Sequence, residues 1–214
     1  MGNTITPAIV IKSRFILNGQ QGKKTAKKYI DYIGRTQTKL DENELKSYQD
    51  YMSDSEKSTG LFTDYSDALD DKEKEYIKNI FEVADKQNSV LWQDVISFDN
   101  QWLKDTGILQ GNHVDEKKLK QATRLAVNEM LKKEKLLDSA IWTASIHYNT
   151  DNMHIHVATV QLKDVRARGN RKQKSLDAMK SKFANAINDR SLENKQLNSF
   201  IRDKLVAYKK NDDL

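Results

Sequence analysis

Three closely spaced histidines are the residues of this sequence best suited to chemistry. They are His147, His154 and His156, and the whole chain of 214 residues has only four histidines. His154 and His156 are two residues apart, and residues i and i+2 of a β-strand point to the same face. Imidazole is the commonest side-chain ligand of transition metals. The spacing therefore predicts a metal or catalytic site more strongly than it predicts three isolated surface histidines.

The residues around the histidines predict a β-hairpin. Apolar and polar side chains alternate from Ile141 to Tyr148 and again from His154 onward, as in strands with two different faces. The turn formers Asn149-Thr150-Asp151-Asn152-Met153 separate the two runs. A hairpin brings all three imidazoles to one face, where they could hold one divalent cation. The fourth histidine, His113, lies in a polar Gly-Asn-His loop and is expected to face solvent.

Two tyrosines near the N-terminus are candidate nucleophiles. Ala8–Leu17 predicts the first strand, and Lys23–Ile33 predicts a helix that Gly34 could end. Tyr29 and Tyr32 are three residues apart and share one side of that helix. Beside a metal, a tyrosine hydroxyl can attack the phosphorus of a phosphodiester. Packing in the core is the alternative interpretation for both side chains.

A basic run follows the second histidine strand. Lys163–Lys182 holds eight basic residues against Asp164 and Asp177, with a flexible Gly169-Asn170 pair inside it. Because the run follows the histidine strand directly, we expect its first part to lie near the histidines and to bind DNA phosphates. The residues expected to do so are Arg166, Arg168, Arg171, Lys172 and Lys174. A solvated surface is the alternative interpretation.

Composition limits the class of protein. The formal net charge is +5 with a pI near 9.1, which is compatible with nucleic-acid binding without being diagnostic of it. The absence of cysteine excludes disulfides and thiolate metal sites and suits the cytoplasm. No apolar run approaches the ~20 residues of a membrane span, and the N-terminus lacks a secretory signal. We expect a cytoplasmic protein without membrane insertion.

The element order predicts an α+β fold with a central, mainly antiparallel sheet. Helices are expected to cover one face of the sheet, and the histidines are expected on the open face. Ser89–Phe98 is expected as a further strand, Leu61-Phe62-Thr63 as a short strand or anchoring turn, and 106–112 as a loop. The further helices are expected over Asp41–Met52, Asp71–Asp85, Val114–Leu136, Ser175–Ile187 and Leu192–Tyr208. We expect one domain over 1–214, in which 163–214 forms the basic loop and the C-terminal helices.

The histidine motif resembles a motif of a known family. His147-x-Asn149-x-x-Asn152-x-His154-x-His156 is similar to the third motif, H-x-D-x-x-N-x-H-x-H, of the relaxases of conjugative and mobilisable elements, in particular the P class. These belong to the HUH endonucleases, which cut single-stranded DNA with a tyrosine. Asn149 replaces the aspartate of the pattern. Tyr32-Ile33-Gly34-Arg35 resembles the family's first motif, and Tyr29-Ile30 does so more weakly.

The resemblance implies a strand-specific nickase that acts at an origin of transfer and forms a 5′-phosphotyrosine intermediate. It implies Tyr32, or else Tyr29, as the nucleophile and Arg35 beside the same phosphate. Asn149, Asp151 and Asn152 would then surround the metal ligands, and the replacement at Asn149 leaves the proton acceptor open. The implied cofactor is a divalent metal, Mn or Mg in the cell, with Zn, Co or Ni also suited. Relaxosome accessory proteins and a coupling protein are the implied partners, and relaxases commonly carry further C-terminal regions.

Two other functions fit the same histidines. A rolling-circle replication initiator shares the histidine pair, but its tyrosine normally follows the histidines, where this chain offers only Tyr208 without a motif. A non-catalytic, metal-containing DNA-binding domain would need no tyrosine at all. Covalent attachment to a single-stranded oligonucleotide distinguishes a nickase from such a domain.

Overall fold

A four-stranded antiparallel sheet forms the centre of the protein. The computed structural model describes residues 8–17, 30, 59–111, 113–148, 153–163 and 168–188. The strand order is β1-β2-β6-β5. The strands are β1 (Ile9–Ile16), β2 (Leu91–Phe98), β5 (Ala140–His147) and β6 (His154–Gln161). The predicted α+β fold with an antiparallel sheet is confirmed.

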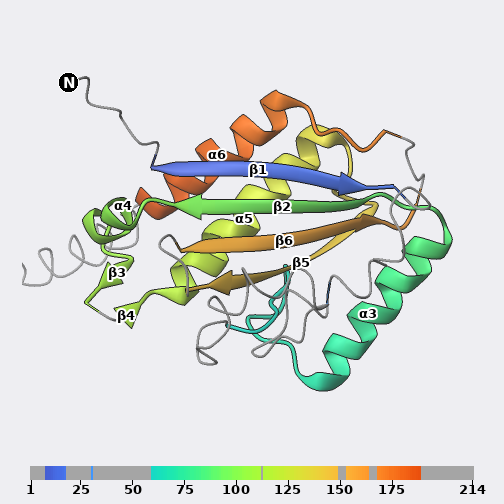
Figure 1. Cartoon of the computed structure of the whole chain (residues 1–214), viewed down its shortest axis with the longest axis horizontal. Helices are drawn as coiled ribbons and strands as arrows, with labels where there is room; N and C mark the ends of the chain where they lie inside the picture. The colour runs from blue at the N-terminus through green and yellow to red at the C-terminus, as the bar shows by residue number, and fades with distance from the viewer. Residues whose placement is uncertain are drawn as a thin grey trace, which may run out of the picture.

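Two antiparallel helices cover one face of the sheet, as Figure 1 shows. They are α5 (Glu116–Glu134) and α6 (Gln173–Asn188). The main core lies between these helices and the sheet, where Trp92 and Ile155 are fully buried. Phe183 of α6 also stacks on a strand residue, Phe98, with ring centroids 5.1 Å apart. The apolar sides of both helices thus meet the apolar side of the sheet, as two-layer packing requires.

A third long helix covers part of the opposite face. α3 (Asp71–Lys86) begins at a capping box in which Asp70 and Glu73 bond each other's backbone N–H groups. Its apolar side packs with Ala158 and Val160 at one end of the sheet, and Ile30 is buried in the same cluster. Among the described residues, α3 and Ile30 cover only this end of the histidine face. Ile30 is helical, as predicted, and the rest of the predicted helix Lys23–Ile33 lies outside the described residues.

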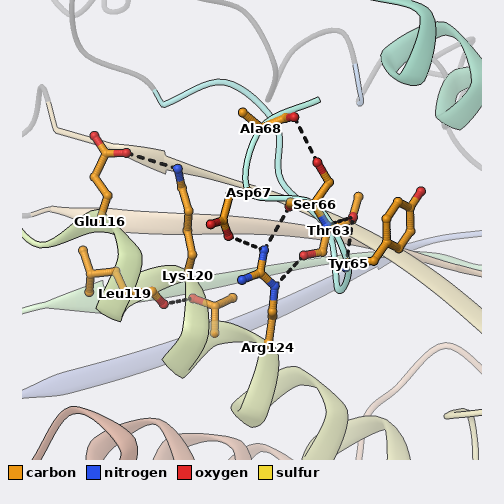
Figure 2. A network of polar contacts seen from close by, with 10 residues as sticks. Thr63, Tyr65, Ser66, Asp67, Ala68, Glu116, Leu119, Lys120 and Arg124 are labelled. Carbon is orange, nitrogen blue, oxygen red and sulfur yellow. Dashed lines mark hydrogen bonds and ion pairs between the residues drawn. The ribbon is translucent and has the colours of Figure 1, made fainter. Parts of the chain in front are cut away.

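A short segment closes the free edge of β5. Phe62 forms an isolated antiparallel bridge with Ala144, which confirms the anchoring role expected for Leu61-Phe62-Thr63. Arg124 of α5 fastens the loop that follows, as Figure 2 shows. Its guanidinium donates to the carbonyls of Thr63 (2.8 Å) and Ser66 (2.9 Å) and to the carboxylate of Asp67 (2.7 Å). The segment is thus held between the edge strand and α5.

Small elements cluster at the end of the sheet opposite to α3 (Figure 1). α4 (Asn100–Asp105) follows β2, and β3 (Leu109–Gln110) pairs with β4 (His113–Val114). The loop expected over 106–112 is thus partly wrong, because a two-residue strand lies inside it. Gly111, at a φ of +60°, lies between the paired residues, in the backbone region that glycine adopts without a steric penalty.

Several expected features lie outside the described residues. These are the helices predicted over Asp41–Met52 and Leu192–Tyr208. Within the described ranges, no helix has the length and apolar character that crossing a membrane would require.

Candidate metal centre

Strand pairing brings the three histidines to one corner of the sheet. His147 is opposite His154, and His156 lies two residues further along β6 on the same face. Ile146 precedes His147, and Ile155 lies between His154 and His156. Both isoleucines point to the other face of the sheet and are fully buried in the core beneath α5 and α6. A register shift would expose this apolar side, so burial of the isoleucines fixes the position of the imidazoles. The predicted convergence of His147, His154 and His156 is confirmed.

The distances between the ring nitrogens suit one divalent cation. One nitrogen from each histidine lies within 4.8 Å of the others. The two Nε2 atoms of His154 and His156 are 3.1 Å apart. Nitrogen ligands at ~2.0–2.1 Å from a tetrahedral metal lie about 3.3 Å from one another, so the rings would move together by at most about 1.5 Å around an ion. The donor set and its spacing therefore fit a metal ion held by three histidines.

The electrostatics of the cluster favour neutral imidazoles. Burial, and then the neighbouring His147 and His154, lower the pKa of His156 to about 3. Three imidazolium ions at this separation would repel one another, and desolvation disfavours each charge further. The neutral ring is the form that binds a metal, so no proton has to leave His156 at neutral pH.

The predicted nucleophiles and several neighbouring residues lie outside the described residues. These are Tyr29, Tyr32, Arg35, Asn149, Asp151, Asn152 and Arg166. Ile30 is described, and it packs in the cluster that contains Ala158. Ala158 lies two residues beyond His156 on the same face of β6, so Ile30 is anchored on the histidine face. The roles predicted for the seven other residues stay predictions.

The basic run does not begin beside the histidines, and this expectation is wrong. β6 starts at His154 and carries the chain about 3.3 Å per residue away from the site, so the run begins at the far end of the sheet. There the indole of Trp92 donates to the carbonyl of Gly169. The ring of Phe15 lies so close to Gly169 that a Cβ there would collide with it. Glycine is needed for this close approach of backbone to ring.

Arg171 has a structural position, and the DNA contact predicted for it is not available in this structure. Its guanidinium grips both carboxylate oxygens of Asp94 at 2.8 to 3.1 Å, on the face opposite to the histidines. Both side chains are 0% exposed, and the guanidinium also lies over the ring of Trp92. By contrast, Arg168, Lys172 and Lys174 are exposed. These three remain candidates for contacts with phosphates.

A cavity beside the hairpin was not predicted from the sequence. Its volume is about 860 Å³, and Tyr148, Met153 and Glu116 contribute to its lining. Burial, and then the Glu116 carboxylate, raise the pKa of Tyr148 above its ordinary range, so its hydroxyl keeps its proton. The lining residues come from segments far apart in sequence, and only the place of Tyr148 next to His147 could have drawn attention to it.

The comparisons with known proteins agree with the geometry of the site. No curated protein sequence matches the chain significantly. A family model of MobL relaxases matches residues 6–213, a range that includes the histidine hairpin and the predicted tyrosine helix. Relaxases of this family nick DNA at the origin of transfer of a mobilised plasmid. With this match over nearly its whole length and three convergent histidines, the chain belongs to the MobL relaxases.

Proposed function

We propose that this relaxase cuts one DNA strand by transesterification, with the hydroxyl of Tyr32 as the attacking group. The tyrosine oxygen forms a bond to phosphorus, the bond from phosphorus to O3′ breaks, and the leaving O3′ takes up a proton. The 5′ end of the strand stays on the enzyme as a phosphotyrosine ester. The bond energy is thereby conserved for later rejoining of the strand. The observation that carries the proposal is the convergence of three imidazoles on the face where Ile30, a residue of the predicted tyrosine helix, is buried.

The three histidines would hold a divalent metal, Mn or Mg in the cell, with Zn, Co or Ni as other ions that suit imidazole ligands. When bound, the ion polarises the scissile phosphate and offsets the charge that develops during attack. The remaining work belongs to the protein chain. The buried Ile146 and Ile155 hold the two strands in register and so keep the imidazoles in place before DNA arrives.

The remaining partners are argued from the family and from exposed charge. Arg168, Lys172 and Lys174 are exposed and could hold the strand away from the cut, whereas Arg35 and Arg166 are proposed from the sequence alone. We expect relaxosome accessory proteins and a coupling protein as partners, and the cytoplasm as the place of action. We also retain the expectation that 1–214 is a single relaxase domain that can be followed by further regions in a longer protein.

We propose a relaxase without the P-class label, because the MobL family is grouped with the Q class. The family match disfavours a rolling-circle initiator, since the family is one of mobilisation relaxases.

The experiment that tests the proposal is covalent capture of an oligonucleotide that spans the nick site of the origin of transfer. With manganese present, the native protein should form an adduct that survives denaturation, and a chelator should prevent it. Tyr32→Phe should bind the oligonucleotide normally and form no adduct, whereas Tyr29→Phe should keep substantial activity. Mass spectrometry then locates the nucleotide. A nucleotide on the Tyr29 peptide would transfer the role to Tyr29, and no adduct under any condition would contradict the proposed chemistry.

A further inference from the structure

The cavity of about 860 Å³ lies around the corner of the sheet from the histidines. Tyr148 follows His147, and Met153 precedes His154, so both side chains point to the face opposite to the imidazoles. Asn100 of α4, Leu109 of β3 and Glu116 at the start of α5 also contribute to the lining. Its volume falls in the ~300–1,000 Å³ range of small-molecule sites. A pocket of this size therefore begins one residue away from two of the metal ligands.

One part of the cavity wall is apolar and packs in the core of the protein. Met153 belongs to the main core, and Leu109 and Tyr148 pack against this core. The side-chain oxygen of Asn100 accepts from the backbone N–H of Met153 at 3.4 Å and ties the base of the hairpin to α4. The hydroxyl group of Tyr148 is buried and lies beside the carboxylate of Glu116, and its burial and this carboxylate both raise its pKa. A ligand that inserts here would meet the apolar ring of Tyr148 with the Glu116 carboxylate next to it.

The charges at the mouth of the cavity disfavour a phosphate. The carboxylate of Asp115 accepts from the backbone N–H of Lys118 at 2.9 Å and so occupies one of the donors at the start of α5. The carboxylate of Glu116 lies beside it and pairs with Lys120 at 3.1 Å, as Figure 2 shows. Lys117 also lines the cavity, so the two carboxylates face one lysine of the lining and leave no excess of positive charge for the backbone of DNA. The carboxylates can accept hydrogen bonds from the amino group of a base.

We propose that this cavity binds one unpaired nucleobase of the substrate strand, next to the scissile phosphate. The base packs on Tyr148 and Met153, and its exocyclic amino group donates to Glu116. Guanine, cytosine and adenine carry such a group and thymine does not, so the site selects against thymine at one position. This inference rests on the proposed function for the nearness of the strand. It adds a determinant of sequence preference that the histidine motif does not contain.

The test is a scan of binding with oligonucleotides that lack one base at a time. Single abasic sites are placed at successive positions around the nick, and affinity is measured by fluorescence anisotropy with a chelator present, so that no cleavage occurs. One position should show a loss of about tenfold for the native protein, as expected for one stacked base. Glu116→Gln and Tyr148→Leu, which removes the aromatic ring, should weaken binding of the intact oligonucleotide and leave binding of that one abasic oligonucleotide unchanged. Glu116→Gln should also reduce the discrimination against thymine there.

The matched control is Glu129→Gln, which alters the same kind of pair on the same helix. Glu129 and Lys133 are four residues apart and lie at 3.6 Å, and neither lines the cavity. This variant should behave like the native protein. Equal losses by the cavity variants on every oligonucleotide, or no position at which they differ from the control, would overturn the proposal. The scan measures binding and needs no covalent step. If the adduct experiment fails, the scan can therefore still test the proposed base site.

Discussion

The imidazole of His156 shares its corner of the sheet with two other imidazoles, and this environment keeps its ring neutral. The low pKa of His156 follows from burial and from the two neighbouring rings, and both effects act against a proton. A metal ion held by the three imidazole nitrogens would replace this repulsion with ligand bonds. A neutral ring can form such a bond without first releasing a proton. At the scale of single residues, the histidines are therefore prepared for a metal before any DNA is bound.

Loss of two ligands should abolish metal binding. Replacing His154 and His156 together by alanine leaves His147 as a single imidazole, which cannot hold a divalent ion alone at micromolar concentration. Calorimetric titration with manganese should show no binding in this double variant. His113→Ala removes a histidine that lies apart from the cluster and should leave the affinity unchanged. Equal affinity in the native protein and the double variant would show that the ion binds elsewhere.

Arg171 should matter for stability rather than for DNA. Arg171→Ala would leave the carboxylate of Asp94 buried without its cation, which typically costs ~3–5 kcal/mol of unfolding free energy. Lys174→Ala, at an exposed position of the same basic run, should change stability by less than ~0.5 kcal/mol. Urea unfolding of both variants measures the difference. If the Arg171→Ala protein is as stable as the native protein but binds DNA weakly, Arg171 contacts DNA and its proposed structural role is wrong.

At the scale of elements, local patterns predicted the site well and long-range placement poorly. The alternation around His147 and His154 was enough to predict the hairpin, because one face of each strand is buried. The position of Arg171 could not be found that way. Its partner Asp94 is 77 residues away in sequence, and nothing in the basic run itself indicates a buried carboxylate.

The predicted helix of the tyrosines shows the same limit. Of this predicted helix only Ile30 belongs to the described residues, and it packs on the histidine face. The choice between Tyr29 and Tyr32 therefore rests on the family motif, which favours Tyr32, and the adduct peptide decides it.

Arg124 is proposed as a positioning residue that acts through residues 59–69. It fastens the loop after Phe62, while Leu61 and Leu69 form part of the cluster that buries Ile30. Arg124→Leu removes the three hydrogen bonds and keeps an apolar stem. Adduct formation should slow several-fold while affinity for manganese stays unchanged, and Arg124→Lys should restore part of the rate. A uniform loss of stability without a slower rate in the folded fraction would assign Arg124 a structural role only.

At the scale of the whole molecule, the histidines and the start of α6 occupy opposite ends of the sheet. β6 leads from His154 to Gln161, and the exposed cations follow only after that end of the strand. A strand cut at the histidines would have to extend along the protein to reach them. This arrangement separates the chemical site from a second, sequence-independent contact with phosphates.

Neutralising the exposed cations should change the salt dependence of binding. Replacement of Arg168, Lys172 and Lys174 together by alanine should reduce the slope of log affinity against log salt by about 2 at most, since each phosphate contact on a single strand contributes ~0.7. Lys86→Ala, an exposed lysine on α3, serves as the control. An unaltered slope in the triple variant would show that these residues form only a solvated surface.

The most direct test of the account is adduct formation by a protein that lacks the histidine site. The His154→Ala, His156→Ala double variant should remain folded by circular dichroism, because both residues lie at the partly exposed end of the sheet. Incubated with manganese and an oligonucleotide from its origin of transfer, it should form no covalent adduct, while the native protein and Glu129→Gln form one. An adduct at the native rate in the folded double variant would contradict the claim that the three-histidine site drives the nicking reaction.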